Sequence, residues 1–240
     1  MKNNELLFAL NVAEELSDYG PAIIEQLQVT EKKRLYSLMV EAFRSFSAFS
    51  KLIKSHYFVQ SCAILRMFAE QMCKTVILSE HQELYNLYEK HCIVREEILD
   101  LSQRDRKRRV VEIFKLNSSQ YTNSLSYLDY GWIKPLNKNG LYGYHEMLKL
   151  ACAEGSSIIT FIDHLDQFIH QNLNTLSLKP ESVPLFEDEN VYCSLICFEK
   201  FFVAFHNLTG KEFVIKGEKL FEDKFWPLYE KILKPEDRTN

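Results

Sequence analysis

The segment from Phe58 to Leu78 is apolar on almost every side of a helix, yet it carries Arg66, Glu70 and Lys74 at intervals of four residues. Side chains four residues apart lie in one line along a helix, so these charges share one side. If that side faces solvent, each pair contributes only about 0.2 to 0.5 kcal/mol. If it faces the interior, each ion is costly to desolvate and needs a partner. The segment therefore predicts a central helix whose charged line has two open interpretations.

Glycine and proline are scarce, with 7 and 6 among 240 residues. Because these residues interrupt helices, their scarcity predicts long elements joined by few loops. The apolar spacing is helical from the start of the chain, and we expect the first helix to stop at Gly20 and Pro21. Further helices are expected at 30–56, with Thr30 as the N-cap, and at 58–78, 84–116, 144–173, 192–206 and 219–233, with a long loop at 117–140 and a linker at 174–189.

These elements predict an all-α protein, a bundle of six to eight helices. We assign residues 1–175 to a helical bundle domain and residues 185–240 to a C-terminal helical appendage. The appendage is expected to contain at most one short strand, from Glu212 to Lys216.

Charge and cysteine usage restrict the class of protein. With 33 acidic and 29 basic residues the net charge is -4, so no global field draws the chain to nucleic acid or to an anionic membrane. The six cysteines lie in apolar helical patterns without a Cys-x-x-Cys spacing, as buried thiols in a reducing compartment do. We find neither a signal peptide pattern nor a run of about 18 apolar residues, because Arg66 and Glu70 interrupt the best candidate. We therefore expect a cytoplasmic protein that does not enter the membrane.

The stretch from Ala63 to Glu70 places an arginine and a glutamate four residues apart in a hydrophobic helix, and Tyr142, Tyr144 and His145 open the helix after the long loop. This combination resembles a widespread bacterial all-α family of unknown function, in which a tyrosine and a histidine near the start of a later helix accompany an Arg-x-x-x-Glu helix. The resemblance covers about residues 30–175. It implies an all-α fold and no particular reaction.

The architecture is also similar to HEPN-type helical bundles, many of which are ribonucleases of toxin and defence systems. Their motif is an arginine followed five to seven residues later by a histidine, and no arginine of this chain has a histidine at that spacing. A metal-independent ribonuclease needs an arginine for the phosphate and a histidine as acid or base. If their two helices pack together, Arg66 and His145 fit these roles. The candidate catalytic residues are therefore Arg66, Glu70, Tyr144 and His145.

A basic cluster is the strongest local charge feature, and it comprises Arg104, Arg106, Lys107, Arg108 and Arg109. It is either the solvated face of a long helix, partly neutralised by neighbouring carboxylates, or a phosphate-binding patch that is blind to sequence and sensitive to salt. The aromatic residues of the following loop either stack on unpaired bases or plug the end of the bundle. These aromatic residues are Tyr121, Tyr127, Tyr130 and Trp132.

Metal and cofactor signatures are absent from the sequence. Helical di-iron sites use Glu-x-x-His pairs, and none of the seven histidines follows a glutamate at that spacing. Asp163, His164, Asp166 and His170 cluster on one expected helix, but the four do not all share one face, so we do not expect them to bind a metal together. Phosphate-loop, dinucleotide-binding and nucleophile-elbow motifs are also missing, so we expect no metal and no cofactor.

Two functions remain. The first is a non-enzymatic interaction or regulatory module of a bacterial defence or stress system, in which Arg66 and Glu70 fix a helix pair and the partner is another protein or a second copy of the chain. The alternative is a metal-independent, ribonuclease-like effector that uses Arg66 and His145, with RNA as the partner.

Overall fold

The computed structural model describes residues 4–26, 32–152, 158–162, 165, 183–209 and 219–233. Every element in this part of the chain is helical, and no strand occurs in it. The expected all-α class is therefore confirmed, although the helices slightly outnumber the six to eight predicted.

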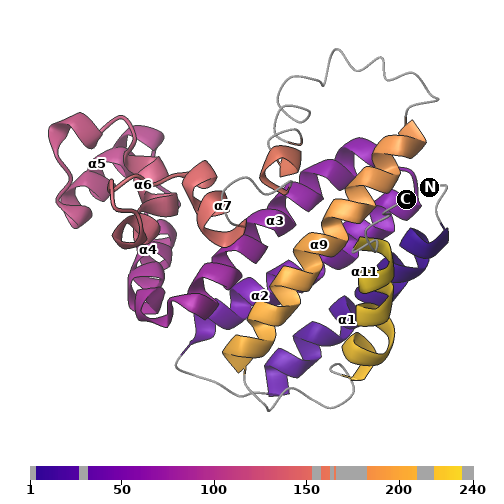
Figure 1. Cartoon of the computed structure of the whole chain (residues 1–240). Helices are drawn as coiled ribbons and strands as arrows, with labels where there is room; N and C mark the ends of the chain where they lie inside the picture. The colour runs from indigo at the N-terminus through magenta and orange to yellow at the C-terminus, as the bar shows by residue number, and fades with distance from the viewer. Residues whose placement is uncertain are drawn as a thin grey trace.

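Four long helices form the core bundle (Figure 1). The central helix α3 packs against α2 on one side and α9 on another, while α1 contacts both α2 and α9. The predicted helix at 58–78 is α3 almost residue for residue, because its continuous apolar pattern fits a helix that is covered on several sides. These core helices are α1 (Asn4–Gln26), α2 (Lys33–Lys54), α3 (Phe58–Glu80) and α9 (Val183–Thr209).

Phenylalanine side chains join these helices. Phe46 of α2 lies 5.1 Å from Phe68 of α3 and 4.4 Å from Phe198 of α9, between ring centroids. Phe43 contacts Phe201 edge to face at 4.8 Å. Such aromatic pairs add about 0.5 to 1.5 kcal/mol each beyond the area that they bury. The many phenylalanines of the sequence are therefore the contact layer of the bundle.

The helix α9 is the one described segment that is long and apolar enough, by length and composition, to cross a membrane, over Glu187–Thr209. Of its apolar window, 56% is buried inside the protein. Phe198, Phe201 and Phe205 are fully buried in the common core, as expected for the core helix of a soluble protein. The apolar pattern of the sequence indicated residues 58–78 as the best membrane candidate, so α9 was not predicted as one.

The expected boundary between residues 175 and 185 lies almost entirely outside the described residues. Helices on both sides of it share one hydrophobic core. After α9, a π-helical segment, η5 (Phe221–Phe225), leads into α11 (Trp226–Leu233), which packs beside α1 (Figure 1). Phe225 is fully buried in that core. The predicted strand at 212–216 and Thr30 fall outside the described residues.

A side lobe extends from one end of the bundle (Figure 1). It has a small hydrophobic core of its own, formed by Val94, Ile98, Val110 and Leu128. The helix α7 leads from this lobe back to the bundle and packs along α3. The elements of this region are η1 (Gln82–Leu84), α4 (Tyr85–Glu97), α5 (Gln103–Phe114), η2 (Ser118–Gln120), α6 (Ser124–Tyr130), η3 (Gly131–Leu136) and α7 (Tyr144–Cys152).

The lobe corrects two sequence predictions. The single helix expected at 84–116 is two helices, because Ser102 caps the start of α5 by accepting a hydrogen bond from the Asp105 amide at 3.2 Å. Arg106 stabilises the break by donating to the carbonyls of Leu99 and Leu101. The loop expected at 117–140 is largely helical, since it contains η2, α6 and η3.

The first helix also differs from its prediction, because α1 continues through Gly20 and Pro21 to Gln26. A Cβ atom at Gly20 would lie 2.3 Å from the Phe43 ring, so the glycine permits close contact between α1 and α2. Tertiary packing on α2 thus outweighs the tendency of proline to end a helix.

Candidate functional site

The charged side chains of α3 form a continuous network of ion pairs, which we call the ladder: Arg66, Glu70 and Lys74. Glu70 accepts hydrogen bonds from Arg66 at 2.9 Å and from Lys74 at 2.6 Å. The side chains of Arg66, Glu70 and Lys74 are 26%, 19% and 11% exposed. The three charges therefore lie neither fully in solvent nor fully in the interior. They are partly buried, and Lys74 is more deeply buried than Arg66.

Electrostatics keep Glu70 ionised. Burial on its own would raise the pKa of this carboxyl, but the charges and hydrogen bonds of Lys74 and Arg66 outweigh burial and lower the pKa below its usual value. A carboxylate whose pKa two cations lower is a poor general acid at neutral pH. Glu70 therefore acts in this geometry as the anion that neutralises Arg66 and Lys74.

Arg66 also contacts α7, because its guanidinium lies 4.2 Å from the centroid of the Tyr144 ring. This cation–π contact joins the charged ladder of α3 to the first residue of α7. Tyr130 lies near, with its ring 6.3 Å from that of Tyr144, and burial together with the Glu70 charge raises the pKa of Tyr130 to about 12. The phenol of Tyr130 therefore stays protonated at neutral pH.

The structure thus brings three of the four candidate catalytic residues together, namely Arg66, Glu70 and Tyr144. His145 is the next residue on α7, and it is exposed. The packing of α7 on α3 was the condition for Arg66 and His145 to belong to one site, and this packing is present.

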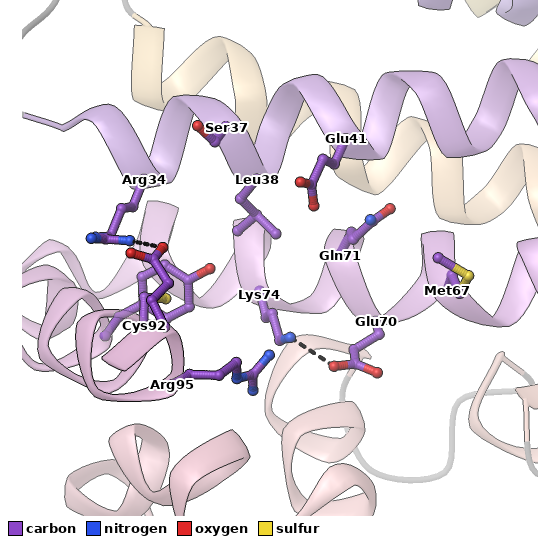
Figure 2. Close-up of a pocket in the computed structure, with 12 residues that line it drawn as sticks. Arg34, Ser37, Leu38, Glu41, Met67, Glu70, Gln71, Lys74, Cys92 and Arg95 are labelled. Atoms are coloured by element: carbon purple, nitrogen blue, oxygen red, sulfur yellow. Dashed lines mark hydrogen bonds and ion pairs between the residues drawn. The ribbon is translucent and has the colours of Figure 1, made fainter. Parts of the chain in front are cut away.

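A cleft of about 350 Å³ opens beside this ladder, between α2, α3 and α4 (Figure 2). Arg95 of α4 points toward the space next to Lys74 and Glu70 (Figure 2), and it pairs with Asp129 of α6. Burial raises the pKa of Asp129 despite the nearby charges of Arg95 and Lys74. The cleft is lined by Arg34, Ser37, Leu38, Glu41, Met67, Glu70, Gln71, Lys74, Tyr88, Cys92, Arg95 and Glu96.

The cleft cysteine is not an activated nucleophile. Burial raises the pKa of the Cys92 thiol, and the neighbouring cations do not offset this effect. A nucleophilic cysteine needs a lowered pKa. We therefore assign Cys92 a packing role in the cleft wall.

Most of the cleft residues were not predicted. Lys74 was visible in the sequence as part of the charged line, but Arg34, Glu41 and Arg95 look like ordinary surface residues of two other helices, α2 and α4. Only the packing of α2, α3 and α4 brings them to one place. A single sequence carries no local signal for such a convergence.

The basic cluster lies on α5, at the outer end of the lobe (Figure 1). Two of its five residues are engaged with other groups of the protein, and three form no ion pair within the described residues. Arg106 is used to bind the carbonyls of Leu99 and Leu101, and Arg109 pairs with Glu112 at 3.0 Å. Within the described residues Arg104, Lys107 and Arg108 form no ion pair with a protein carboxylate.

The lobe aromatics mainly fill its interior. Trp132 is 1% exposed and its ring lies 5.2 Å from that of Tyr88. Tyr127 packs against Phe114 at 5.4 Å. Tyr121 is the member of the predicted group that stays exposed. Trp132 is therefore a plug of the lobe and has no face open for a base.

Within the described residues no group of three or more metal-binding side chains comes together. Asp163, His164, Asp166 and His170 lie outside the described residues.

Fold and site together define an all-α protein with a core bundle, a helical side lobe and a charged cleft where the two meet. Compared with known family models, curated proteins and solved structures, the chain shows no match.

Proposed function

We propose that this protein is a non-enzymatic interaction or regulatory module. The observation that carries the proposal is the closed ladder: Glu70 is bonded to both Arg66 and Lys74, and the guanidinium of Arg66 lies against Tyr144. Each charged group is engaged with a neighbour from the same site. The ladder therefore serves to hold α7 and the lobe in one position on the bundle, as a register-fixing network does.

A phosphate ligand at Arg66 competes with this arrangement. Binding it requires the guanidinium to leave Glu70 or to share its donors with it, and a charge-assisted hydrogen bond is worth about 1.5 to 3 kcal/mol. The negative charge of Glu70 also repels a phosphate. Both effects favour a structural role for Arg66 over a catalytic one.

The biological setting is proposed from the cysteine usage, which favours a reducing compartment, from the resemblance to a bacterial all-α family, and from the similarity to HEPN-type bundles, many of which belong to defence systems. We assign the module to the bacterial cytoplasm and to a defence or stress system, with another protein or a second copy of the chain as its partner. Size-exclusion chromatography with light scattering tests the second copy directly, because a homodimer doubles the measured mass.

The test compares wild-type protein with Arg66→Ala and with Arg44→Ala as a matched control, since Arg44 is an exposed arginine of α2. Thermal melts by circular dichroism and cleavage of mixed single-stranded and structured RNA are measured on all three. We expect no cleavage by any protein, a lowered melting temperature for Arg66→Ala and an unchanged one for Arg44→Ala. RNA cleavage by wild type that disappears in a folded Arg66→Ala protein contradicts the proposal.

A metal-independent ribonuclease is the second candidate function, with Arg66 binding the phosphate and His145 transferring the proton. The observation that favours it is the contact between Arg66 and Tyr144, the residue next to His145. Its test is RNA cleavage in the presence of a metal chelator. On this hypothesis cleavage is lost in His145→Ala and retained in His81→Ala, a histidine located before η1.

A further inference from the structure

We propose that one side of helix α5, in the lobe, binds the phosphate backbone of a single-stranded nucleic acid, with Tyr121 as the ring on which a base stacks. This inference goes beyond the interaction role proposed above, because it concerns another surface and a partner that is not a protein. Its support is the arrangement of charges around α5, a lysine from a second helix, and an exposed aromatic ring beside them.

Three basic side chains lie along one side of α5. Arg104, Lys107 and Arg108 are spaced by three and four residues, so they are neighbours on the surface of the helix. Arg104 and Arg108 are exposed, and Lys107 is partly exposed. Within the described residues none of the three side chains forms an ion pair or a hydrogen bond. This side of the helix therefore carries three positive charges without a protein partner.

The acidic residues of α5 follow a different line and are already engaged. Asp105, Arg109 and Glu112 are spaced by four and three residues, so they share a neighbouring side of the helix. The Asp105 carboxylate accepts a hydrogen bond from the hydroxyl of Ser102 at 2.6 Å, and that of Glu112 accepts one from Arg109 at 3.0 Å. Neither carboxylate pairs with the three cations of the basic line, so α5 itself does not neutralise them.

A lysine of α4 adds to the same side. Phe114 lies two helical turns after Lys107 and therefore continues the basic line of α5. The Nζ atom of Lys90 lies 5.2 Å from the centroid of the Phe114 ring. Lys90 is exposed, and among the described residues it forms no ion pair. Cations from two helices thus meet along one side of α5, and we call Lys90, Arg104, Lys107 and Arg108 the basic face.

An exposed aromatic ring lies next to the basic face. The hydroxyl of Tyr121 donates to the backbone carbonyl of Arg104 at 3.5 Å, and Tyr121 is 37% exposed. Surfaces that bind single strands combine cations along the phosphates with aromatic rings on which bases stack. A duplex hides the faces of its bases, and an anionic membrane offers no base to stack. The combination therefore favours a single strand as the partner.

The experiment measures fluorescence anisotropy of labelled oligouridylate and oligothymidylate dodecamers titrated with the full chain, in the presence of a metal chelator. We expect saturable binding at about 50 mM salt that weakens strongly by about 200 mM. Four phosphate contacts on a single strand correspond to a slope of log affinity against log salt of about −3. Saturable binding of either strand supports the inference, and a preference for one of them identifies the partner as RNA or DNA.

The main variant replaces the three α5 cations with glutamine, which is about as good a helix former as arginine or lysine. We expect it to weaken binding at least about tenfold and to make the salt slope shallower by about 2. This triple variant is Arg104→Gln, Lys107→Gln and Arg108→Gln. The control removes the same amount of charge from exposed positions of α2 and η5 and should bind like wild type. It consists of Arg44→Gln, Lys51→Gln and Lys224→Gln.

Variants of the tyrosine test the stacking contact. Tyr121→Leu should weaken binding about fivefold or more, whereas Tyr121→Phe keeps the ring and should bind nearly as wild type does. Circular dichroism melts establish that each variant is folded.

Four results would overturn the inference. They are the absence of saturable binding of both strands, equal binding by the folded basic triple variant and its control, a duplex of the same length that binds as tightly as the single strands, and binding only to vesicles of phosphatidylcholine with phosphatidylserine. The proposed function is tested by melting and by RNA cleavage of ladder variants, so it and this inference fail independently.

Discussion

At the scale of single residues, Glu70 determines whether the charged ladder holds. It is the only carboxylate that the described contacts place between Arg66 and Lys74, and all three side chains are mostly buried. Removing the anion takes the carboxylate partner from the mostly buried Lys74 and one ion pair from Arg66. This loss costs far more than the modest net gain from forming an exposed pair.

We therefore expect Glu70→Gln to lower the free energy of unfolding by about 2 to 3 kcal/mol. The matched control is Glu80→Gln on the same helix, which should change it by less than about 0.5 kcal/mol because Glu80 is exposed. Urea denaturation followed by circular dichroism measures both. Equal stabilities for the two variants would show that the ladder makes no structural contribution.

His91 gives a second prediction, on pH dependence. It is 2% exposed and its Nδ1 donates to the carbonyl of Leu128 at 2.9 Å, while Nε2 is buried without a partner among the described residues. Burial, together with the charges of Lys90 and Arg95, lowers the pKa of His91 from 6.5 to about 4. Between these two values the unfolded chain binds a proton that the folded protein does not.

Stability therefore falls as the pH decreases from 6.5 to 4, by about 3 kcal/mol in total from this residue. His91→Phe cannot titrate and keeps a ring beside Phe114 and Tyr127. At pH 6.5 the free energy of unfolding of His91→Phe should be lower than that of wild type, because the hydrogen bond to Leu128 is lost. Between pH 6.5 and pH 4 it should decline less steeply than that of wild type. Urea denaturation at several pH values compares the two slopes, and parallel slopes would refute the assignment.

At the scale of helices, the sequence correctly predicted the helices whose apolar spacing is continuous. It did not predict a helix boundary that depends on a short polar capping signal. The bounds of α3 and the buried face of α2 follow from apolar spacing, which requires no knowledge of the partner helix. The break between α4 and α5 does not, since apolar residues such as Ile98 and Leu101 continue the helical rhythm across it. Ser102 followed by Asp105 is a capping signal that could have located the break. Of the candidate site, the pair of Arg66 and Glu70 could be predicted from its spacing in the sequence. The cleft could not, because its residues come together only through the packing of separate helices.

The docking of α7 on α3 gives a prediction at this scale. Tyr144→Phe keeps the ring over Arg66, whereas Tyr144→Ala removes it. A partly desolvated cation–π contact is worth about 1 to 2 kcal/mol, so amide exchange in α7 should become about tenfold faster in Tyr144→Ala and change little in Tyr144→Phe. Hydrogen–deuterium exchange measured by mass spectrometry resolves this segment. Tyr121→Ala, at an exposed lobe position, is the control. Unchanged protection of α7 in Tyr144→Ala would mean that other contacts hold the helix.

At the scale of the whole molecule, the described helix α9 near the C-terminal end of the chain is part of the core. Phe198, Phe201 and Phe205 of α9 are fully buried among side chains of α2 and α3. Burying a phenylalanine contributes about 1.5 to 3 kcal/mol, so the gross contribution of these three side chains is as large as the lower part of the net stability of about 5 to 15 kcal/mol that is usual for a domain. The division that the sequence predicts, between residues 1–175 and 185–240, therefore separates two parts of the chain whose described helices share one core.

We predict that residues 1–175, expressed without the rest of the chain, do not form a stable native structure. Without α9, the apolar faces of α1, α2 and α3 lose their common partner and stay exposed. The fragment should aggregate, or should retain helical circular dichroism while binding anilinonaphthalene sulfonate and melting without a cooperative transition, as a molten globule does. The full chain, which should melt cooperatively and bind little dye, is the reference. A cooperative melt of the fragment with native helical content would instead establish residues 1–175 as an independent domain, and α9 would then be a helix that docks on a bundle already formed.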